Sequence, residues 1–296
     1  MIREKSFSYK IIDALIYLVI GIILLACILP FIHEIALSFS SRLSVIGGKV
    51  QLIPVKPTLD NYSAIWAKPE FGQALVVSII RVVVAVPVTL LVVILTSYPL
   101  AMERLYFPGR LVFMMVMIFA NLFQVGLIPR FLSFKNLHLI DNFLVLILPM
   151  LLSTFNVILT MNFFKGIPFE MIEAATLDGA SHWDILTKLM VPLSTPVLAT
   201  ISLFTIVAHW NAYFDGIVYI RDTSMRPLQS YLFSMLTGDS GIQGEFGGFR
   251  FGRFPQASPD GAAAAMILFA ILPVFIIYPF VQRYIISGMH LGSVKE

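Results

Sequence analysis

The chain has 296 residues, of which 58% are hydrophobic and 12% are charged, and its mean hydropathy is +0.88. This composition lies outside the range of soluble globular domains, and a net charge of +3 gives no reason to expect nucleic acid as a partner. The single cysteine, Cys27, excludes an internal disulfide and a cysteine-ligated metal cluster. Charges gather in short segments between apolar runs of about twenty residues, the length that crosses a bilayer as a helix. The sequence therefore predicts an all-α membrane protein.

Six apolar runs are long enough to be membrane spans. Helices are the expected structure because hydrocarbon offers no partner to an unpaired backbone group. Six spans place both chain ends on one side, and the basic N-terminal tail and the short basic turn at 103–110 favour the cytoplasmic side. The predicted spans are about 11–37, 75–102, 111–129, 143–163, 193–220 and 262–285.

Arg81 falls within the second predicted span. Val82 to Met102 already supplies an uncharged stretch long enough to cross the bilayer. We therefore expect Arg81 to lie at the outer interface and to extend its side chain toward the headgroups. A buried arginine would instead indicate a functional role.

The sequence lacks the motifs of an independent enzyme or ion-driven carrier. It has no G-x-x-x-x-G-K-[ST] loop and no H-E-x-x-H, and its five histidines are scattered. A secondary transporter would also show internal repeats and paired carboxylates in its spans, and neither is found. We expect no catalytic residue and no metal or cofactor in this chain, so another subunit must supply the energy.

The loop at 165–192 is too polar to be a span and is predicted to form two short helices. Pro168 suits the first position of the first helix, and Glu170 lies in the early turns, where the helix dipole favours an anion. Gly179 can take the positive φ that commonly ends a helix. The first helix should therefore run from Pro168 to just before Gly179.

The second helix of the loop should begin at a capping box formed by Ser181 and Asp184 and end at Pro192. Its apolar positions share one face and are Ile185, Leu186 and Leu189, flanked by Trp183. The two helices should form a compact hairpin with an exposed apolar side, and such a surface requires a partner.

The sequence EAATLDGASHWDILTKLMVPLSTP at 173–196 resembles the EAA loop of the membrane subunits of binding-protein-dependent ABC importers. That pattern is Glu-Ala-Ala, then Asp-Gly-Ala, then an apolar helix ending in Leu-Pro and a further proline; Val191 replaces the usual leucine. The matching positions are Glu173, Ala174, Ala175, Asp178, Gly179, Ala180, Trp183, Lys188, Pro192 and Pro196.

Other segments are similar to the carbohydrate-uptake class of these importers. They are NFFKGIP at 162–168, WNAYF at 210–214 and SGMHLGSVKE at 287–296. Two more, GLIPRFL at 126–132 and RPLQSYL at 226–232, resemble the branch that handles complex oligosaccharides.

The resemblance implies one transmembrane permease domain over 1–296, with the EAA loop and both termini in the cytoplasm of a bacterial cell and the protein in its inner membrane. It implies four kinds of partner: a second homologous permease subunit, a cytoplasmic ATPase dimer that binds ATP and Mg, an external solute-binding protein, and membrane lipid. The cargo would be a sugar, and the resemblance to that branch implies an oligosaccharide. A peptide or lipid-linked solute fits the same architecture, and a secondary transporter is the weaker alternative.

The resemblance also implies roles for the loop residues in coupling to the ATPase. Glu173 would pair with a basic residue of the ATPase, and small residues would keep the contact close. The apolar residues would either fill a groove on the ATPase or hold the loop to the ends of the spans. The implied coupling residues are Glu173, Ala174, Ala175, Asp178, Gly179, Ala180, Trp183, Ile185, Leu186 and Leu189.

Polar and aromatic residues in or near the spans are candidates for the substrate path. The alternative is that the polar groups make hydrogen bonds between helices and that the aromatic rings mark the membrane interface. The candidates are Asn121, Gln124, Asn156, His209, Trp210, Asn211, Tyr213 and Asp215.

An external loop is predicted at 221–260, and GEFGGFRFGRF at 244–254 alternates aromatic and basic residues among glycines. The resemblance implies that this segment reaches into the binding protein to release substrate. The alternative is a loop that packs its own aromatic side chains against the mouth of the path. The candidate contact residues are Phe246, Phe249, Arg250, Phe251, Arg253 and Phe254.

Overall fold

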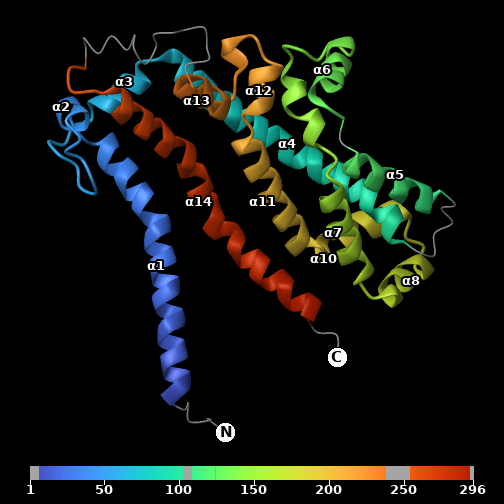
Figure 1. Ribbon diagram of the computed structural model, residues 1–296. Helices are drawn as coiled ribbons and strands as arrows, with labels where there is room; N and C mark the ends of the chain where they lie inside the picture. The colour runs from blue at the N-terminus through green and yellow to red at the C-terminus, as the bar shows by residue number, and fades with distance from the viewer. Residues whose placement is uncertain (1–6, 103–108, 124, 238–253, 294–296) are drawn as a thin grey trace. The chain divides into compact units, whose positions relative to one another are not determined.

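The computed structural model describes residues 7–102, 109–123, 125–237 and 254–293 (Figure 1). These residues are helical apart from turns, loops and one isolated bridge between Ser40 and Pro57. The all-α prediction is thus confirmed for the described chain. Contacts divide the chain into two compact units, one from residues 1–69 and 234–272 and the other from 70–233 and 273–296.

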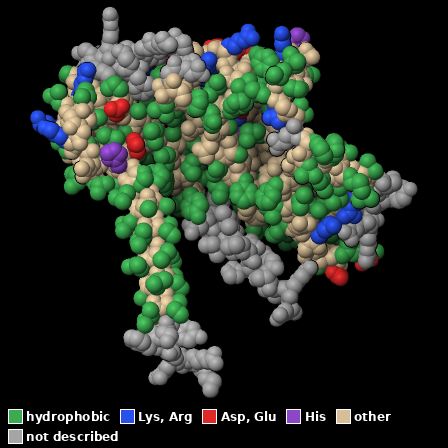
Figure 2. Space-filling view, in the orientation of Figure 1, with side chains coloured by type: hydrophobic (Ala, Val, Ile, Leu, Met, Phe, Trp, Pro, Cys, Tyr) green, Lys and Arg blue, Asp and Glu red, His purple; other side chains and the backbone are tan. Residues whose placement is uncertain are grey.

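The first unit contains the most exposed apolar helix. Hydrophobic side chains of α1 are exposed along its length, from Ile11 at 52% to Ile35 at 43%, and Figure 2 shows them over its visible face. A helix that is apolar on every side needs a bilayer or a partner to cover it. The helices wholly or partly in this unit are α1 (Phe7–Ser38), α2 (Arg42–Ile46), α3 (Asp60–Trp66), α13 (Leu228–Thr237) and α14 (Pro259–Ser293).

Asn61, on α3, joins three segments of the first unit. Its amide donates to the carbonyls of Ser38 (2.9 Å) and Ser40 (3.1 Å), and its carbonyl accepts from the Ser258 backbone N–H at 2.9 Å. Gly261 lets α14 approach this closely, because a Cβ there would lie 2.6 Å from the Asn61 side chain. The buried amide is therefore fully used in joining α3 to the end of α1 and the start of α14.

The second unit contains most of the described helices. In Figure 1, α7 and α11 lie side by side, and their residues are in contact. The elements are α4 (Pro69–Ala101), α5 (Arg110–Leu122), α6 (Leu127–Asn136), the 3₁₀ turns η1 (Phe143–Leu146) and η2 (Leu148–Met150), α7 (Thr154–Lys165), α8 (Phe169–Leu177), α9 (His182–Asp184), the π-helix η3 (Ile185–Met190), α10 (Val191–Leu193), α11 (Thr195–Asn211), α12 (Phe214–Val218) and the 3₁₀ turn η4 (Thr223–Met225).

Three described helices, α1, α4 and α14, are each long and apolar enough to cross a membrane. They coincide closely with the predicted spans 11–37, 75–102 and 262–285. Three further pairs of helices pass the same test together although each is bent, so the described chain has up to six candidate spans.

The other three predicted spans are interrupted. The run predicted at 143–163 consists of η1 and η2 followed by α7, with a bend of 50°. Ser153 causes α7 to start afresh, since its side chain accepts from the Asn156 N–H and caps the helix. The run predicted at 193–220 stops at Asn211, and the run at 111–129 stops at Leu122. Apolar length alone does not reveal these breaks.

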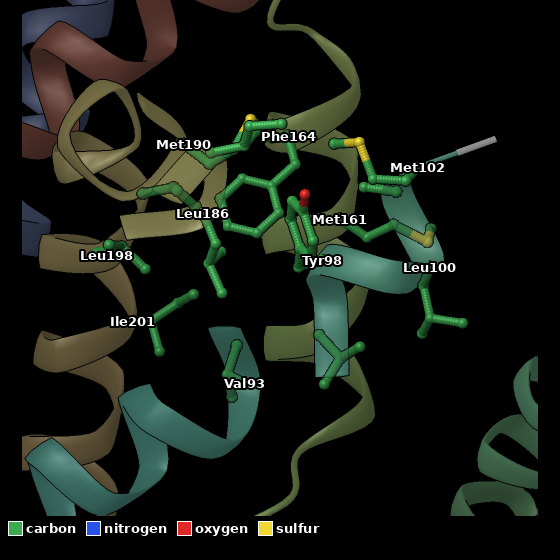
Figure 3. Packing of buried hydrophobic residues seen from close by; sticks show 14 of the residues in the cluster. Val93, Tyr98, Leu100, Met102, Met161, Phe164, Leu186, Met190, Leu198 and Ile201 are labelled. Carbon is green, nitrogen blue, oxygen red and sulfur yellow. The ribbon is translucent and has the colours of Figure 1, made fainter. Parts of the chain in front are cut away.

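The main core of the second unit joins the end of α4 to α7, η3 and α11. Val93, Phe164, Met190 and Ile201 are at most 1% exposed. Figure 3 shows Phe164, Met190 and Leu186 converging beside Tyr98. The segment predicted as a coupling loop thus contributes side chains to the same core as the long helices.

Candidate functional site

The predicted hairpin at 165–192 is present, and its turn has the expected geometry. The first helix, α8, begins at Phe169, one residue after Pro168. It ends at Leu177, and Gly179 follows with φ +82°. The turn is closed by backbone hydrogen bonds from Gly179 to Thr176 and from Ala180 to Ala175, each 3.0 Å. Gly179 therefore provides the left-handed residue that the sequence predicted.

The predicted capping box at the start of the second helix is also confirmed. The Ser181 hydroxyl accepts from the Asp184 N–H, and the Asp184 carboxylate accepts from the Ser181 N–H, both at 3.2 Å. The Lys188 ammonium lies 2.6 Å from the same carboxylate. The Lys188 and Ser181 hydrogen bonds lower the pKa of Asp184 to about 2. Asp184 therefore remains charged through the physiological range and fixes this helix start.

The predicted end of the second helix at Pro192 is one residue early. The helix continues from α9 through the π-helix η3 and on to Leu193 in α10. Pro192 thus lies in the last turn of this continuous helix, and a bend of 78° separates the helix from α11. A single turn of π-helix is uncommon and is often found at functional sites.

The apolar residues of the hairpin divide into two groups. Ile185 and Leu186, 2% and 4% exposed, are buried in the core shown in Figure 3. Trp183 is 61% exposed, and Leu177, which the sequence analysis did not single out, is 84% exposed. Of the two roles considered, Ile185 and Leu186 hold the hairpin to the helix ends. Trp183 and Leu177 are left on its surface.

The remaining predicted coupling residues lie at or near the surface of the hairpin. Glu173, Ala174 and Asp178 are exposed, while Ala175, Ala180 and Leu189 are half-buried against the core. The exposed set gives α8 and its turn a small-residue surface with two carboxylates.

A contact that the sequence did not predict joins the hairpin to α4. The Tyr98 hydroxyl lies 3.3 Å from His182 Nδ1, and the two rings meet edge to face at 6.4 Å. Tyr98 lies near the end of α4, so this helix and the hairpin are joined by a polar contact as well as by the core.

The second unit also contains an open cavity of about 490 Å³. Two of the predicted substrate-path residues, Asn156 and His209, line it. The aromatic rings in its wall are Phe155 and Phe204, with centroids 6.0 Å apart. The full lining is Pro149, Met150, Leu152, Ser153, Phe155, Asn156, Phe204, Thr205, Ala208 and His209. Polar groups and aromatic faces are thus brought together on one surface.

Arg81 is buried, and the prediction that it extends to the interface is wrong. Its side chain is 0% exposed and forms an ion pair with both oxygens of Asp215. The same guanidinium donates to His209 Nδ1 at 3.3 Å and to the Ala212 carbonyl at 3.4 Å. The interruption between α11 and α12 leaves that carbonyl outside a helix, so Arg81 satisfies it.

The other predicted substrate-path residues do not line this cavity. Asn121 and Asn211 are exposed, and Trp210 is buried at 4% exposure. Tyr213 stacks on Phe233 with ring centroids 4.8 Å apart. Gln124 lies outside the described residues.

Most of the predicted binding-protein loop lies outside the described residues. This holds for Phe246, Phe249, Arg250, Phe251 and Arg253. Phe254 is half-buried against Ala64 and Ala257 in the first unit.

Residues 63–290 match the model of the family described as the binding-protein-dependent transport system inner membrane component. The chain belongs to this family. It is 37% identical over 286 residues to the polygalacturonan/rhamnogalacturonan transport system permease protein YtcP of Bacillus subtilis, covering 97% of this chain and 99% of YtcP. It is 35% identical over 286 residues to protein LplC of the same organism, covering 97% and 95%.

A solved structure has the same fold. A bacterial ABC transporter involved in the import of the acidic polysaccharide alginate contains a chain that superposes with a TM-score of 0.88 at 33% identity. The superposition covers 95% of this chain and 99% of that one. The protein is therefore a permease subunit of the binding-protein-dependent type.

In this permease, the sequence did not predict contacts between residues that are distant in the chain. Arg81 and Asp215 are 134 positions apart, and Tyr98 and His182 are 84 apart. One signal was available for the first pair: both residues carry charge beside long apolar runs, where a buried charge requires an opposite one.

Proposed function

We propose that this permease carries an oligosaccharide from an external solute-binding protein into the bacterial cytoplasm, driven by ATP hydrolysis on a separate subunit. One observation carries the proposal. A helical hairpin presents exposed Trp183 and Leu177, while its buried face is part of the core shared with α4, α7 and α11. A force applied to the hairpin would thus act directly on the long helices.

The proposed topology has six spans, with the hairpin and both termini in the cytoplasm of the inner-membrane protein. There the hairpin docks on a cytoplasmic ATPase dimer that binds ATP and Mg. Glu173 is exposed on α8 and free to approach a basic residue of that partner. Closure of the ATPase dimer would move the hairpin and rotate the permease subunits as rigid bodies between inward-open and outward-open states.

The proposed cargo is an oligosaccharide, because related permeases act on polygalacturonan, rhamnogalacturonan and alginate. The cavity beside His209 and Asn156 suits this class. Sugar rings present apolar faces that stack on aromatic side chains and hydroxyls that exchange hydrogen bonds with polar ones. The cavity offers both kinds of contact.

Two further partners complete the proposed assembly. A second homologous permease would form the other half of the path, within the lipid bilayer. The external solute-binding protein would contact the loop at 221–260, including 244–254, and deletion of 244–254 should then reduce uptake. Unchanged uptake after this deletion would remove the loop from the proposal.

Purification tests the assembly directly. The tagged chain, extracted in mild detergent, should bring with it an ATPase and a second permease of similar length. Recovery of the folded chain alone, from cells that express the whole transport operon, would contradict the proposal.

Gly179 tests the coupling role. Its φ of +82° is strained for any side chain with a Cβ, although the site has open space. Gly179→Val should therefore distort the turn and reduce binding-protein-stimulated ATP hydrolysis, while membrane insertion is retained. Gly179→Asn is the matched control, because asparagine tolerates the left-handed region. Normal stimulated hydrolysis in the valine variant would count against the role.

A further inference from the structure

Tyr98 and His182 form a polar contact between the end of α4 and the hairpin. The Tyr98 hydroxyl lies 3.3 Å from His182 Nδ1, and the two rings meet edge to face with centroids 6.4 Å apart. A tyrosine hydroxyl can donate or accept, so it pairs with Nδ1 whichever ring nitrogen carries the proton. The hydrogen bond therefore does not depend on the protonation state of His182.

Each partner of this hydrogen bond is held by its own surroundings. Tyr98 is 7% exposed, and Figure 3 shows its ring among the core side chains beside Phe164. His182 is an exposed residue, but it is the first residue of α9 and lies between Ser181 and Asp184, which form the capping box. Because both positions are already ordered, the contact between them costs little further conformational entropy.

The hydrogen bond differs from the apolar packing around it in its dependence on geometry. The free energy gained by burying apolar surface has no preferred direction, whereas a hydrogen bond weakens steeply when its length or angle departs from the optimum. A small sliding displacement between α4 and the hairpin would therefore break the Tyr98–His182 hydrogen bond while most apolar contacts persisted. The pair thus fixes where the hairpin lies along α4.

The helix α4 connects this contact to the buried ion pair. It is one continuous helix from Pro69 to Ala101, with Tyr98 near its end and Arg81 about 25 Å away along its axis. Arg81 in turn binds Asp215 and the Ala212 carbonyl, where α11 is interrupted. A displacement of the hairpin that α4 follows would thus reach the interruption between α11 and α12.

We propose that Tyr98 and His182 are positioning residues for ATP-driven transport, because their hydrogen bond makes α4 follow the hairpin when the hairpin moves. His182 is the chain neighbour of Trp183, which is exposed on the surface proposed to dock on the ATPase. A displacement at that surface therefore acts on the polar contact one residue away. The inference rests on the transport function proposed above, and it adds the helix that receives the displacement and the two side chains that transmit it.

Substitutions at the two positions separate the hydrogen bond from the packing. Tyr98→Phe keeps the buried ring and removes only the hydroxyl, and His182→Leu removes the nitrogen that meets it. His182→Asn is the conservative variant, because an atom of its amide group occupies the position of Nδ1. Tyr62→Phe is the matched control, since it removes a hydroxyl that donates to the Ser38 hydroxyl at 2.9 Å in the first unit.

The assay measures how much radiolabelled trigalacturonate is taken up for each ATP hydrolysed. It uses proteoliposomes that contain the complete complex purified with the tagged chain, with binding protein outside and ATP available to the ATPase. We expect Tyr98→Phe and His182→Leu each to lower uptake per ATP by about two- to fivefold, where fivefold is the full effect of about 1 kcal/mol for one hydrogen bond. The double variant should be no lower than either single variant, because both changes remove the same contact. His182→Asn and Tyr62→Phe should match wild type.

Thermal unfolding of the same variants distinguishes this role from a purely structural one. A structural role predicts that Tyr98→Phe lowers the thermal midpoint and reduces uptake and stimulated hydrolysis in the same proportion, so that uptake per ATP is unchanged. That result would overturn the inference. A loss in His182→Asn as large as that in His182→Leu, or a double variant far below both single ones, would also overturn it.

Wild type provides the test of the proposed function itself. If wild type shows no hydrolysis stimulated by the binding protein and takes up neither trigalacturonate nor a neutral trisaccharide, the proposed function fails. Normal coupled uptake by wild type, together with unchanged uptake per ATP in Tyr98→Phe, refutes only the role of Tyr98 and His182.

Discussion

Replacing Asp215 with asparagine should destabilise the second unit more than removing the whole ion pair. Asp215→Asn keeps the shape and one acceptor but leaves the Arg81 guanidinium, which is 0% exposed, without a counter-charge. Arg81→Met/Asp215→Leu removes both charges and fills the space with apolar atoms. A buried charge that loses its partner is costly, whereas an apolar replacement of both partners often is not.

The structure sets the size of the effect. Breaking a buried pair costs about 3–5 kcal/mol, and the lower end applies to Asp215→Asn because the amide oxygen still accepts one hydrogen bond. The double variant leaves the Ala212 carbonyl without the donor it has at 3.4 Å, a loss of about 1–3 kcal/mol. We therefore expect about 3 kcal/mol for the single variant and about half of that for the double variant.

Thermal unfolding of the purified chain in detergent, followed by tryptophan fluorescence, to which the buried Trp210 contributes, measures the difference. For a domain of about 200 residues, 1 kcal/mol shifts the midpoint by about 2–4 °C. Asp215→Asn should lower it by about 6–12 °C, and the double variant by no more than about half as much. A double variant at least as destabilised as the single one would show that the charges themselves stabilise the fold, and would refute the reasoning.

Three further outcomes follow from the structure. The Asp184 carboxylate, whose pKa is lowered to about 2 in the folded protein, stabilises the folded state at any pH above its unfolded pKa. Wild type should therefore have a higher thermal midpoint than Asp184→Asn at pH 6 and above, and this difference should vanish as the pH falls from about 4 to about 2. A difference in midpoint that does not depend on pH would contradict this prediction. Gly261→Ala places a Cβ 2.6 Å from the Asn61 amide and should lower the free energy of unfolding by about 1–3 kcal/mol in the same thermal assay. An alanine at a glycine with open space around it should have no such effect. An unchanged thermal midpoint in Gly261→Ala would refute the close contact. Trp183→Ala and Leu177→Ala remove exposed side chains, so the thermal midpoint should stay within about 1 °C of wild type while less ATPase is recovered with the permease on purification. A lower midpoint with normal recovery of the ATPase would show that the two side chains stabilise the fold and do not bind the ATPase.

Local chemistry made much of the hairpin predictable from sequence. A capping box needs two residues three apart, and a left-handed turn needs a glycine, so Ser181, Asp184 and Gly179 could be assigned without a structure. Ile185 and Leu186 were recognised as one apolar face. Whether that face packs on the core or on a partner depends on the positions of α7 and α11. Only the structure therefore shows that these two residues hold the hairpin to the helix ends and are not free to fill a groove on the ATPase.

Interruptions of the long helices were not predictable in the same way. The stretch from Asn211 to Phe214 contains no proline or glycine, yet α11 ends there. The interruption is stabilised by partners from elsewhere: Arg81 donates to the Ala212 carbonyl, and the Ser230 hydroxyl donates to the Tyr213 carbonyl at 2.7 Å. The hydropathy of the region shows only that it is apolar, so a prediction from hydropathy gives one span where the structure has α11 and α12.

The separation of Arg81 from Asp215 along the chain has a consequence for biogenesis. Synthesis from the N-terminus delivers α4 to the membrane while Asp215 is still untranslated, so the arginine first meets the bilayer without a counter-ion. A lone arginine at the centre of a span costs about 2.5–3.5 kcal/mol, but the uncharged stretch from Val82 to Met102 can cross by itself and leave Arg81 at the surface. The interfacial position would then be a temporary stage of insertion, and the arrival of α12 would draw the arginine into the protein. Burial of Arg81 would therefore occur only after α4 and α12 have come together and Asp215 can pair with it.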